Sequence, residues 1–168
     1  MAKSNKTKLH EAGGFHRAEH AHGRCVGRAL DRAEALCRQR GARLTRMRRR
    51  VLELIWDSHK AVKAYDLLDR LSESEKSVRP PTVYRSLEFL MAHGLVHRVD
   101  SLNAFVGCSG SDEWHDAQFL ICRECGEVSE MEGAAIGQAV ARQAAVAGFT
   151  VRRQMVELHG ECPSCAAS

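Results

Sequence analysis

The chain has 168 residues, of which 44% are hydrophobic and 27% charged, and it carries seven cysteines, nine histidines and a formal net charge of +4. This length and apolar content suit one or two small domains, each with a buried core. No apolar run approaches the ~18 residues of a membrane span, and no apolar block follows the N-terminal lysines, so we expect neither a transmembrane helix nor a signal peptide. We therefore expect a cytoplasmic protein, whose cysteines bind metal rather than form a disulfide framework.

The net charge is unevenly distributed along the chain. Residues 1–110 contain 21 basic and 12 acidic side chains, for a charge of +9, whereas residues 111–168 contain 4 and 9, for a charge of −5. Fourteen of the basic residues fall within the first 50, and they include Arg46, Arg48, Arg49 and Arg50. Such a concentration suits the neutralisation of nucleic-acid phosphates; the alternative is a solvated, arginine-rich helix face.

The N-terminal part of the chain predicts an arm and two helices. Residues 1–24 are polar, contain four histidines and have no apolar period, so we predict a flexible arm. Apolar residues then recur at helical spacing up to Cys37, and Gly41 ends this first helix. Thr45 is a good N-cap for a second helix, which has an apolar face of its own and ends before Asp57.

Two more helices and a hairpin complete the first predicted domain, over residues 25–107. A short third helix takes in Tyr65 and the leucines after it, and a fourth starts at the pair Pro80-Pro81 and ends at Gly94. Two strand-like runs follow, at 95–99 and 104–107. Three helices and then a hairpin is the order of a winged helix-turn-helix, in which the last helix before the hairpin enters the major groove of DNA.

The rest of the chain predicts a hinge and a second, smaller domain. Residues 108–116 are polar and form the hinge. Within residues 117–168, strands are expected at 117–121, 127–131 and 149–158, and an alanine-rich helix at 134–147. The fold class predicted for the whole chain is therefore α+β, with a winged-helix domain followed by a small domain of mixed strands and helix.

Two CxxC pairs mark the second domain, Cys122 with Cys125 and Cys162 with Cys165, and 36 residues separate them. Each pair presents two thiolates from one tight turn, and two such turns make a tetrahedral four-cysteine zinc site. Four thiolates leave no open coordination position, so we predict a structural zinc. A thiol oxidoreductase and a zinc deaminase are the enzymatic alternatives, and the surroundings of these cysteines match neither well.

Several motifs that occur together in one protein family stand in order along the chain: Arg43-Leu44-Thr45 with Arg48, Ala64-Tyr65-Asp66-Leu67-Leu68, Pro80-Pro81-Thr82-Val83-Tyr84-Arg85, Gly94-Leu95-Val96-His97, and the two CxxC pairs. With them the chain resembles, from about Arg28 to Cys165, the ferric uptake regulator family of metal-responsive repressors, and in particular its zinc uptake regulator branch. The resemblance implies a homodimer with an N-terminal winged helix, a C-terminal dimerisation domain that holds zinc with four cysteines, and a sensor metal at the hinge.

The resemblance also implies the ligands of the sensor metal, which at the matching positions of this chain are His97, Cys108, His115 and Glu130. One thiolate, two imidazoles and one carboxylate suit zinc better than iron(II) or manganese(II), which favour harder oxygen and nitrogen ligands. Residues 114–119 also lack the histidine-rich stretch that iron and manganese members carry before the first CxxC. We therefore expect two zinc ions per chain, one structural and one regulatory.

The predicted function is that of a zinc-responsive transcriptional repressor, not an enzyme, which binds palindromic double-stranded operator DNA as a zinc-loaded dimer and controls zinc homeostasis genes. We expect Tyr84 and Arg85 to contact bases, and Thr82, Arg46 and Arg48 to contact DNA beside them, the last two at phosphates. The alternatives are a core position for Tyr84 and a phosphate contact for Arg85. No membrane partner or small-molecule substrate is expected. A sensor of iron or manganese, a zinc-storage protein and a zinc-dependent enzyme are the alternative functions.

Overall fold

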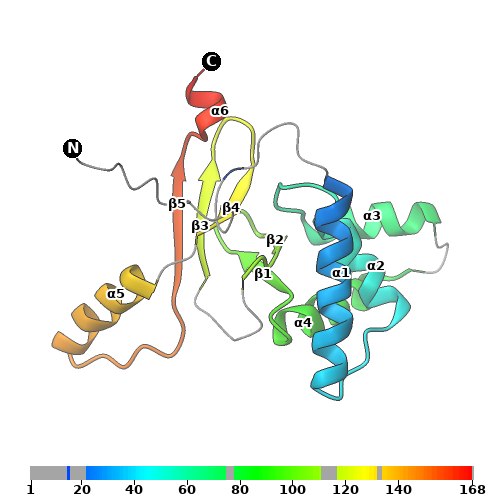
Figure 1. Ribbon diagram of the computed structural model, residues 1–168, viewed down its shortest axis with the longest axis horizontal. Coiled ribbons are helices and arrows are strands. Elements are labelled where there is room, and N and C mark those ends of the chain that lie inside the picture. The colour runs from blue at the N-terminus through cyan, green and yellow to red at the C-terminus, as the bar shows by residue number, and fades with distance from the viewer. Residues whose placement is uncertain (1–14, 16–21, 75–77, 111–116, 132–133, 168) are drawn as a thin grey trace, which may run out of the picture.

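The computed structural model describes residues 15, 22–74, 78–110, 117–131 and 134–167. Figure 1 shows a group of helices with a small hairpin on one side of the molecule and a separate sheet on the other. The helical part consists of α1 (His22–Gln39), α2 (Arg46–Trp56), α3 (Ala64–Ser74) and α4 (Pro80–Ala92). The antiparallel strands β1 (Val96–Val99) and β2 (Ala104–Gly107) form the hairpin. The predicted order of helices and hairpin in a winged helix is confirmed.

The ends of these helices follow from local sequence. The side chain of Thr45 caps α2 by accepting a hydrogen bond from the backbone N–H of Arg48 at 3.4 Å. Pro80 stands in the first turn of α4, where a missing N–H costs nothing, and Gly94 follows that helix at a φ of 67°. One boundary differs from the prediction: α1 begins at His22, so residues 22–24, which we assigned to the arm, are helical.

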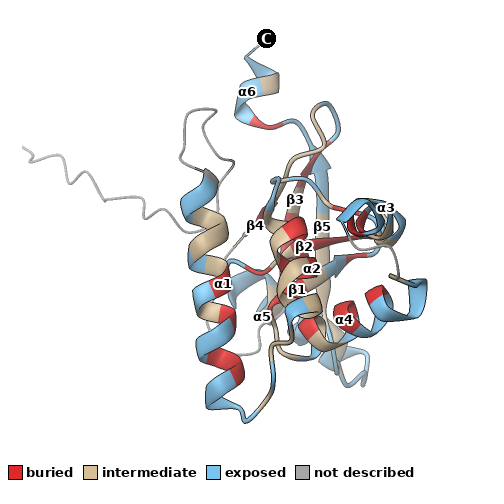
Figure 2. Cartoon of the chain, turned by 90° about the vertical axis from the view of Figure 1, so that its right-hand side faces the viewer, coloured by how far each residue is buried: buried red, intermediate tan, exposed pale blue. Residues whose placement is uncertain are grey.

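One apolar core holds the helical part together. It joins buried residues of all four helices to the hairpin through Leu95, Val96 and Phe105. In Figure 2 the buried residues of α1 lie on the side of the helix that faces the rest of the domain. Cys37 belongs to this core and is only 2% exposed, as its place in the apolar period predicted.

The second part of the molecule is a three-stranded sheet with one long helix. The strands β3 (Ala117–Cys122), β4 (Val128–Glu130) and β5 (Met155–Gly160) lie in the order β4-β3-β5, with β3 antiparallel to β4 and parallel to β5. Helix α5 (Ala134–Val146) connects β4 to β5, and the short α6 (Pro163–Ala166) follows β5. The mixed helix and sheet architecture confirms the predicted fold class.

The prediction that the last strand starts at Phe149 is wrong. β5 begins at Met155, which pairs with Ala117, the first residue of β3. The residues before Met155 therefore have no partner in β3 with which to form a strand, and Phe149 itself is 68% exposed. No residue of α5 is buried among the residues that the structure describes, although Ile136 and Val140 of this helix are apolar.

A second, smaller core joins the hairpin to the sheet. Val99 and Val106 of the hairpin pack with Ala117, Phe119 and Ile121 of β3. The winged helix thus rests on the sheet through both strands of its hairpin. The segment after α2 adds a second contact, because Lys60 forms a β-bridge with Glu127 and the backbone N–H of Val128 donates to the His59 carbonyl at 2.9 Å. None of the helices in the described part of the chain is both long and apolar enough to cross a bilayer.

Candidate functional site

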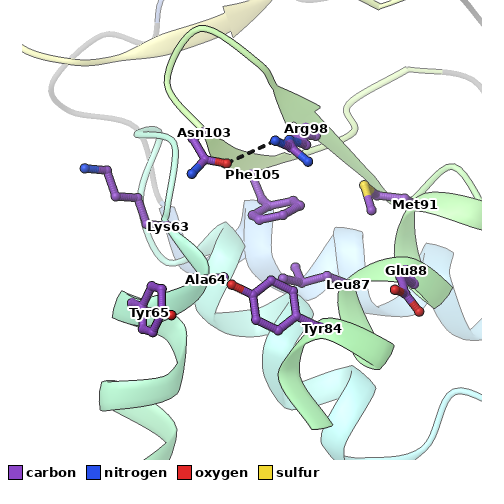
Figure 3. Close-up of a pocket in the computed structure, with 10 residues that line it drawn as sticks. All are labelled: Lys63, Ala64, Tyr65, Tyr84, Leu87, Glu88, Met91, Arg98, Asn103 and Phe105. Atoms are coloured by element: carbon purple, nitrogen blue, oxygen red, sulfur yellow. Dashed lines mark hydrogen bonds between the residues drawn. The ribbon is translucent and has the colours of Figure 1, made fainter. Parts of the chain in front are cut away.

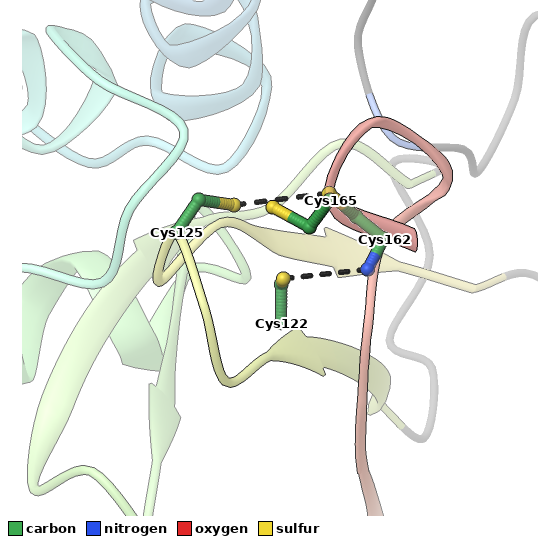
Figure 4. A group of neighbouring side chains, drawn as sticks. All are labelled: Cys122, Cys125, Cys162 and Cys165. Carbon is green, nitrogen blue, oxygen red and sulfur yellow. Dashed lines mark hydrogen bonds between the residues drawn. The ribbon is translucent and has the colours of Figure 1, made fainter. Parts of the chain in front are cut away.

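The four cysteines of the CxxC pairs come together at one edge of the sheet (Figure 4). Because β3 and β5 are parallel, with Cys122 opposite Gly160, the chain leaves both strands at the same edge. Cys125 lies in the turn after β3, and Cys162 and Cys165 lie at the start of α6 and within it. The four sulfur atoms all lie within 4.8 Å of one another.

The geometry of these sulfurs fits a tetrahedral zinc ion. The Sγ atoms of Cys125 and Cys162 are 3.8 Å apart, and none of the four cysteines is in a disulfide. Four sulfurs held about 2.3 Å from a zinc ion in a tetrahedron are about 3.8 Å from one another. The turn after Cys125 needs a left-handed backbone, which Gly126 supplies at a φ of 75°.

The electrostatics of the cluster also call for a cation. Hydrogen bonds from the backbone of Cys125 and Cys162 lower the pKa of Cys122 to about 6. The neighbouring Cys162 sulfur and burial instead raise the pKa of Cys165 to about 12. Four thiols this close cannot all ionise by themselves, because each thiolate repels the next. A divalent soft cation removes that repulsion, and zinc is the metal that suits a closed four-sulfur set.

Three of the four predicted sensor ligands meet where the hairpin touches the sheet. His97 comes from β1, Cys108 follows β2, and Glu130 ends β4; their ligand atoms lie within 4.8 Å of one another. The Nε2 atom of His97 is 3.2 Å from Oε1 of Glu130. Cys108 and Glu130 are 2% and 8% exposed. The fourth predicted ligand, His115, lies outside the residues that the structure describes.

Neighbouring groups fix the orientation of these three side chains. Ser109 donates to Oε2 of Glu130 from its backbone N–H at 2.8 Å and from its hydroxyl at 2.9 Å. Arg32 of α1 donates to the carbonyl oxygen of Cys108 at 2.9 Å. The ring of His97 packs edge-on against Phe119, with 5.7 Å between ring centres. Such supporting contacts tune ligand geometry in metal sites, and sequence spacing gave no signal for any of them.

The contacts of His97 favour its protonated form when no metal is bound. Burial lowers its pKa, but hydrogen bonds with Cys108 and Glu130 outweigh burial and raise the pKa to about 9. A metal ligated by the imidazole takes the place of that proton. A thiol, an imidazole and a carboxylate together are a donor set that zinc accepts readily.

The predicted DNA-contacting residues of α4 lie on its outer face. Thr82 and Arg85 are exposed and Tyr84 is 43% exposed, while Val83 among them and Leu87 after them are buried. Tyr84 is therefore not part of the core. The helix presents three polar or aromatic side chains outward from its first two turns.

Tyr84 lines a hollow between α3, α4 and the hairpin with a volume of about 210 Å³ (Figure 3). The rings of Tyr65, Tyr84 and Phe105 line it, and Lys63 and Arg98 stand on either side. Tyr65 does not share the buried face of the α3 leucines, since it is 67% exposed. Cations on the recognition-helix side of a winged helix suit contact with DNA phosphates, and the sequence pattern did not point to Lys63, Tyr65 or Arg98 as site residues.

The arginines of α2 are used in different ways. The Arg48 guanidinium lies 3.5 Å from the centre of the Phe89 ring and donates to the carbonyl oxygen of Arg43 at 2.6 Å. Arg49 and Arg50 form ion pairs with acidic side chains of the same domain, Glu34 and Glu53. Arg46 is exposed in the first turn of the helix. Part of the basic cluster thus stabilises the domain itself.

Comparison with known proteins gives consistent matches over most of the chain. A model of the ferric uptake regulator family matches residues 39–159. The zinc uptake regulation protein of Escherichia coli (strain K12) is 42% identical over 137 residues, which cover 81% of this chain and 80% of that protein. A solved structure described as a zinc uptake regulator complexed with zinc and DNA has a TM-score of 0.80 at 40% identity, over 84% of this chain and 95% of that one.

The protein XcZur has been solved in two states. The holo form matches with a TM-score of 0.77 at 44% identity, over 83% of this chain and 97% of that one. The apo form matches with a TM-score of 0.50 at 42% identity, over 84% of this chain and 97% of that one. From the family model and the identity to the E. coli protein, the chain belongs to the ferric uptake regulator family.

Proposed function

We propose that this protein is a zinc-responsive transcriptional repressor, which binds palindromic operator DNA as a zinc-loaded homodimer and controls zinc homeostasis genes. The observation that carries this proposal is its similarity, at 40% identity and a TM-score of 0.80, to a zinc uptake regulator with zinc and DNA bound. The matched region includes both the winged helix and the sheet, so the likeness extends to the way the two parts are arranged. Such a regulator acts in the cytoplasm, where the DNA is.

The four-cysteine cluster is assigned a structural zinc. Its ligands all belong to the sheet domain, and they join the turn after β3 to the segment after β5. A zinc ion with four sulfur ligands has no place for a substrate, so the site serves folding rather than catalysis. This closed donor set argues against a zinc-dependent enzyme.

His97, Cys108 and Glu130 are assigned to the regulatory zinc, with His115 as the fourth ligand from the hinge. The hairpin supplies His97 and the sheet supplies Glu130, so a metal here holds the winged helix against the sheet. The described conformation matches holo XcZur much better than apo XcZur, although identity and coverage are nearly the same. This difference supports an arrangement that metal stabilises. Zinc binding would therefore favour the orientation that is competent for DNA.

DNA recognition is assigned to α4, with Tyr84 and Arg85 at bases and Thr82 at DNA beside them. Arg46 and Arg48 of α2 are assigned to phosphates. Two copies of α4 must lie about one helical turn of DNA apart to read a palindrome, which requires a dimer. The exposed apolar residues of α5, of the segment after it and of the outer strand β5 suit that dimer contact: Ile136, Val140, Val146, Phe149 and Leu158. Their burial between two copies would remove an apolar surface that a monomer rarely exposes.

An operator-binding titration tests this function. A duplex is first selected from a randomised library with zinc-loaded protein, and its binding is then measured with metal-stripped protein against buffered free Zn²⁺, Fe²⁺ or Mn²⁺. We expect zinc to restore binding at the lowest free concentration, with two zinc ions per chain at saturation. Restoration by iron or manganese at physiological concentrations, but not by zinc, would assign the protein to another metal. DNA binding that ignores every metal would refute the regulatory role.

A further inference from the structure

Three side chains form a row across the sheet beneath the hairpin. Phe119 of the central strand pairs with Glu130 of β4 on one side and with Glu157 of β5 on the other. Directly paired residues of neighbouring strands point to the same face of a sheet. Phe119 is fully buried against the hairpin, so both carboxylates flank it on the face that the hairpin covers.

The hairpin is attached at both ends of this row. At one end His97 meets Glu130, within the candidate regulatory zinc site. At the other end the turn after β1 meets Glu157: the backbone N–H groups of Asp100 and Ser101 donate to its two carboxylate oxygens at 2.8 and 3.2 Å. β1 and the turn after it thus reach a carboxylate on each outer strand of the described sheet, and only the first of these contacts involves candidate metal ligands.

The turn held by Glu157 is connected to the proposed DNA-binding face. Asn103 closes the turn with an N–H bond to the Asp100 carbonyl at 3.1 Å. Arg98 pairs with the Asp100 carboxylate at 3.1 Å and donates to the Asn103 side chain at 3.1 Å. Arg98 also lines the hollow beside Tyr84. A carboxylate on the sheet therefore fixes the turn to which Arg98, a cation of β1 next to the recognition helix, is bonded.

Packing alone does not require this carboxylate. Glu157 is half-buried and lies outside both apolar cores, and water could satisfy two amides at the surface. Burial raises the pKa of Glu157, but hydrogen bonds from Ser101 and the Asp100 backbone outweigh it and hold that pKa below its usual value. The contact exists only while the hairpin rests on the sheet. It therefore stabilises that arrangement relative to any other.

We infer that Glu157 is a metal-independent anchor of the hairpin, and that it sets the free zinc concentration at which the protein binds DNA. The inference rests on the proposed function and extends it from the zinc ligands to a residue that binds no metal. Zinc and Glu157 favour the same arrangement from opposite ends of the row. Without Glu157, more of the binding energy of zinc is used to bring the hairpin onto the sheet, so half-maximal DNA binding needs more zinc.

The test compares variants of the full-length protein on the selected duplex across buffered free zinc. Loss of two hydrogen bonds to a charged acceptor in Glu157→Ala should raise the zinc concentration for half-maximal binding about tenfold. Glu157→Gln keeps one oxygen acceptor and should shift the midpoint less. At saturating zinc all variants should bind the duplex with nearly the wild-type affinity. Glu73→Ala removes an exposed carboxylate of α3 and is the matched charge control, with no expected shift.

A second variant removes the contact from the other partner. Ser101 is the second residue of the turn closed by Asn103, a position that proline favours, so Ser101→Pro deletes its backbone and hydroxyl donors to Glu157 while keeping the turn. It should raise the zinc midpoint as Glu157→Ala does, and the double variant should shift it by less than the sum of the two shifts. Hydrogen exchange of the Asp100 amide should also become faster in Glu157→Ala. Zinc content and sedimentation check that two zinc ions and the dimer are retained.

The outcomes separate this inference from the function on which it rests. If the wild-type protein responds to zinc and Glu157→Ala binds the duplex with the same zinc midpoint, the inference about Glu157 is overturned and the proposed function stands. Equal loss of DNA affinity at every zinc concentration would also overturn it, because Glu157 would then act on the fold or on DNA contact. If Glu157→Ala fails to fold, Glu157→Gln and Ser101→Pro carry the same test. A wild-type protein without any zinc response would overturn the proposed function and the anchor with it.

Discussion

The proton on His97 makes zinc binding at the regulatory site depend on pH. With a pKa of about 9, the imidazole is about 99% protonated at pH 7 when the site holds no metal. The ligating form is neutral, so zinc must displace this proton. From pH 6.5 to 8.5 the apparent zinc affinity should therefore rise about tenfold per pH unit through His97 alone, which corresponds to about 1.4 kcal/mol per unit. Other ligands that lose a proton add to this slope.

Competition with a chromophoric chelator, corrected for its own protonation, measures the apparent affinity at several pH values. The matched variant is His97→Gln, which keeps a side chain of similar reach but has no titrating group. Its zinc affinity should be lower at every pH, and its slope against pH should be smaller by about one proton per zinc. Equal slopes for the two proteins would show that His97 does not exchange a proton for zinc, and would remove it from the site.

Four further outcomes are expected from the described contacts. In protein whose regulatory site holds no metal, the raised pKa of His97 adds stability that is fully present below pH 6.5 and is lost as pH rises through about 9, measurable by urea unfolding as at most about 3 kcal/mol. Cys125→Ser should unfold the sheet domain and abolish the dimer in sedimentation, since zinc binding there is partly folding free energy; a stable dimer lacking one zinc would contradict this. Cys108→Ser should remain dimeric and hold one zinc tightly but lose zinc-dependent operator binding. Arg85→Ala should weaken binding to the selected duplex by about 1–3 kcal/mol and to random DNA little, whereas equal losses would make Arg85 a phosphate contact.

Local sequence signals predicted the elements of the winged helix because each has its own boundary marker. Thr45, Pro80 and Gly94 act on residues within one turn of themselves, so their effect is visible without knowledge of the fold. The two CxxC pairs predicted their cluster for a similar reason, since each pair is a unit whose spacing already suits a metal. The family resemblance, rather than spacing, brought His97 and Glu130 together.

Contacts that depend on strand register were not predictable in this way. Glu157 is one acidic residue in an alternating run, and only its pairing opposite Phe119 places it under the hairpin. Ser109 is a polar residue after a strand, and only the approach of β4 turns it into a donor to Glu130. The start of β5 likewise depends on where β3 begins.

The two candidate zinc sites differ in what a bound metal would stabilise. The ligands of the cysteine cluster all come from the sheet domain, so zinc there joins parts of that domain to one another and binds no residue of the winged helix. His97 and Glu130 come from the two parts, so zinc there changes the free energy of one arrangement relative to another. A metal can regulate only through such a difference. The Phe119 contact and the Glu157 hydrogen bonds favour the same arrangement without metal. Zinc at the regulatory site therefore needs to supply only the part of the free-energy difference between the arrangements that these contacts leave. The less free energy zinc must supply, the lower the free zinc concentration at which the protein passes from one arrangement to the other.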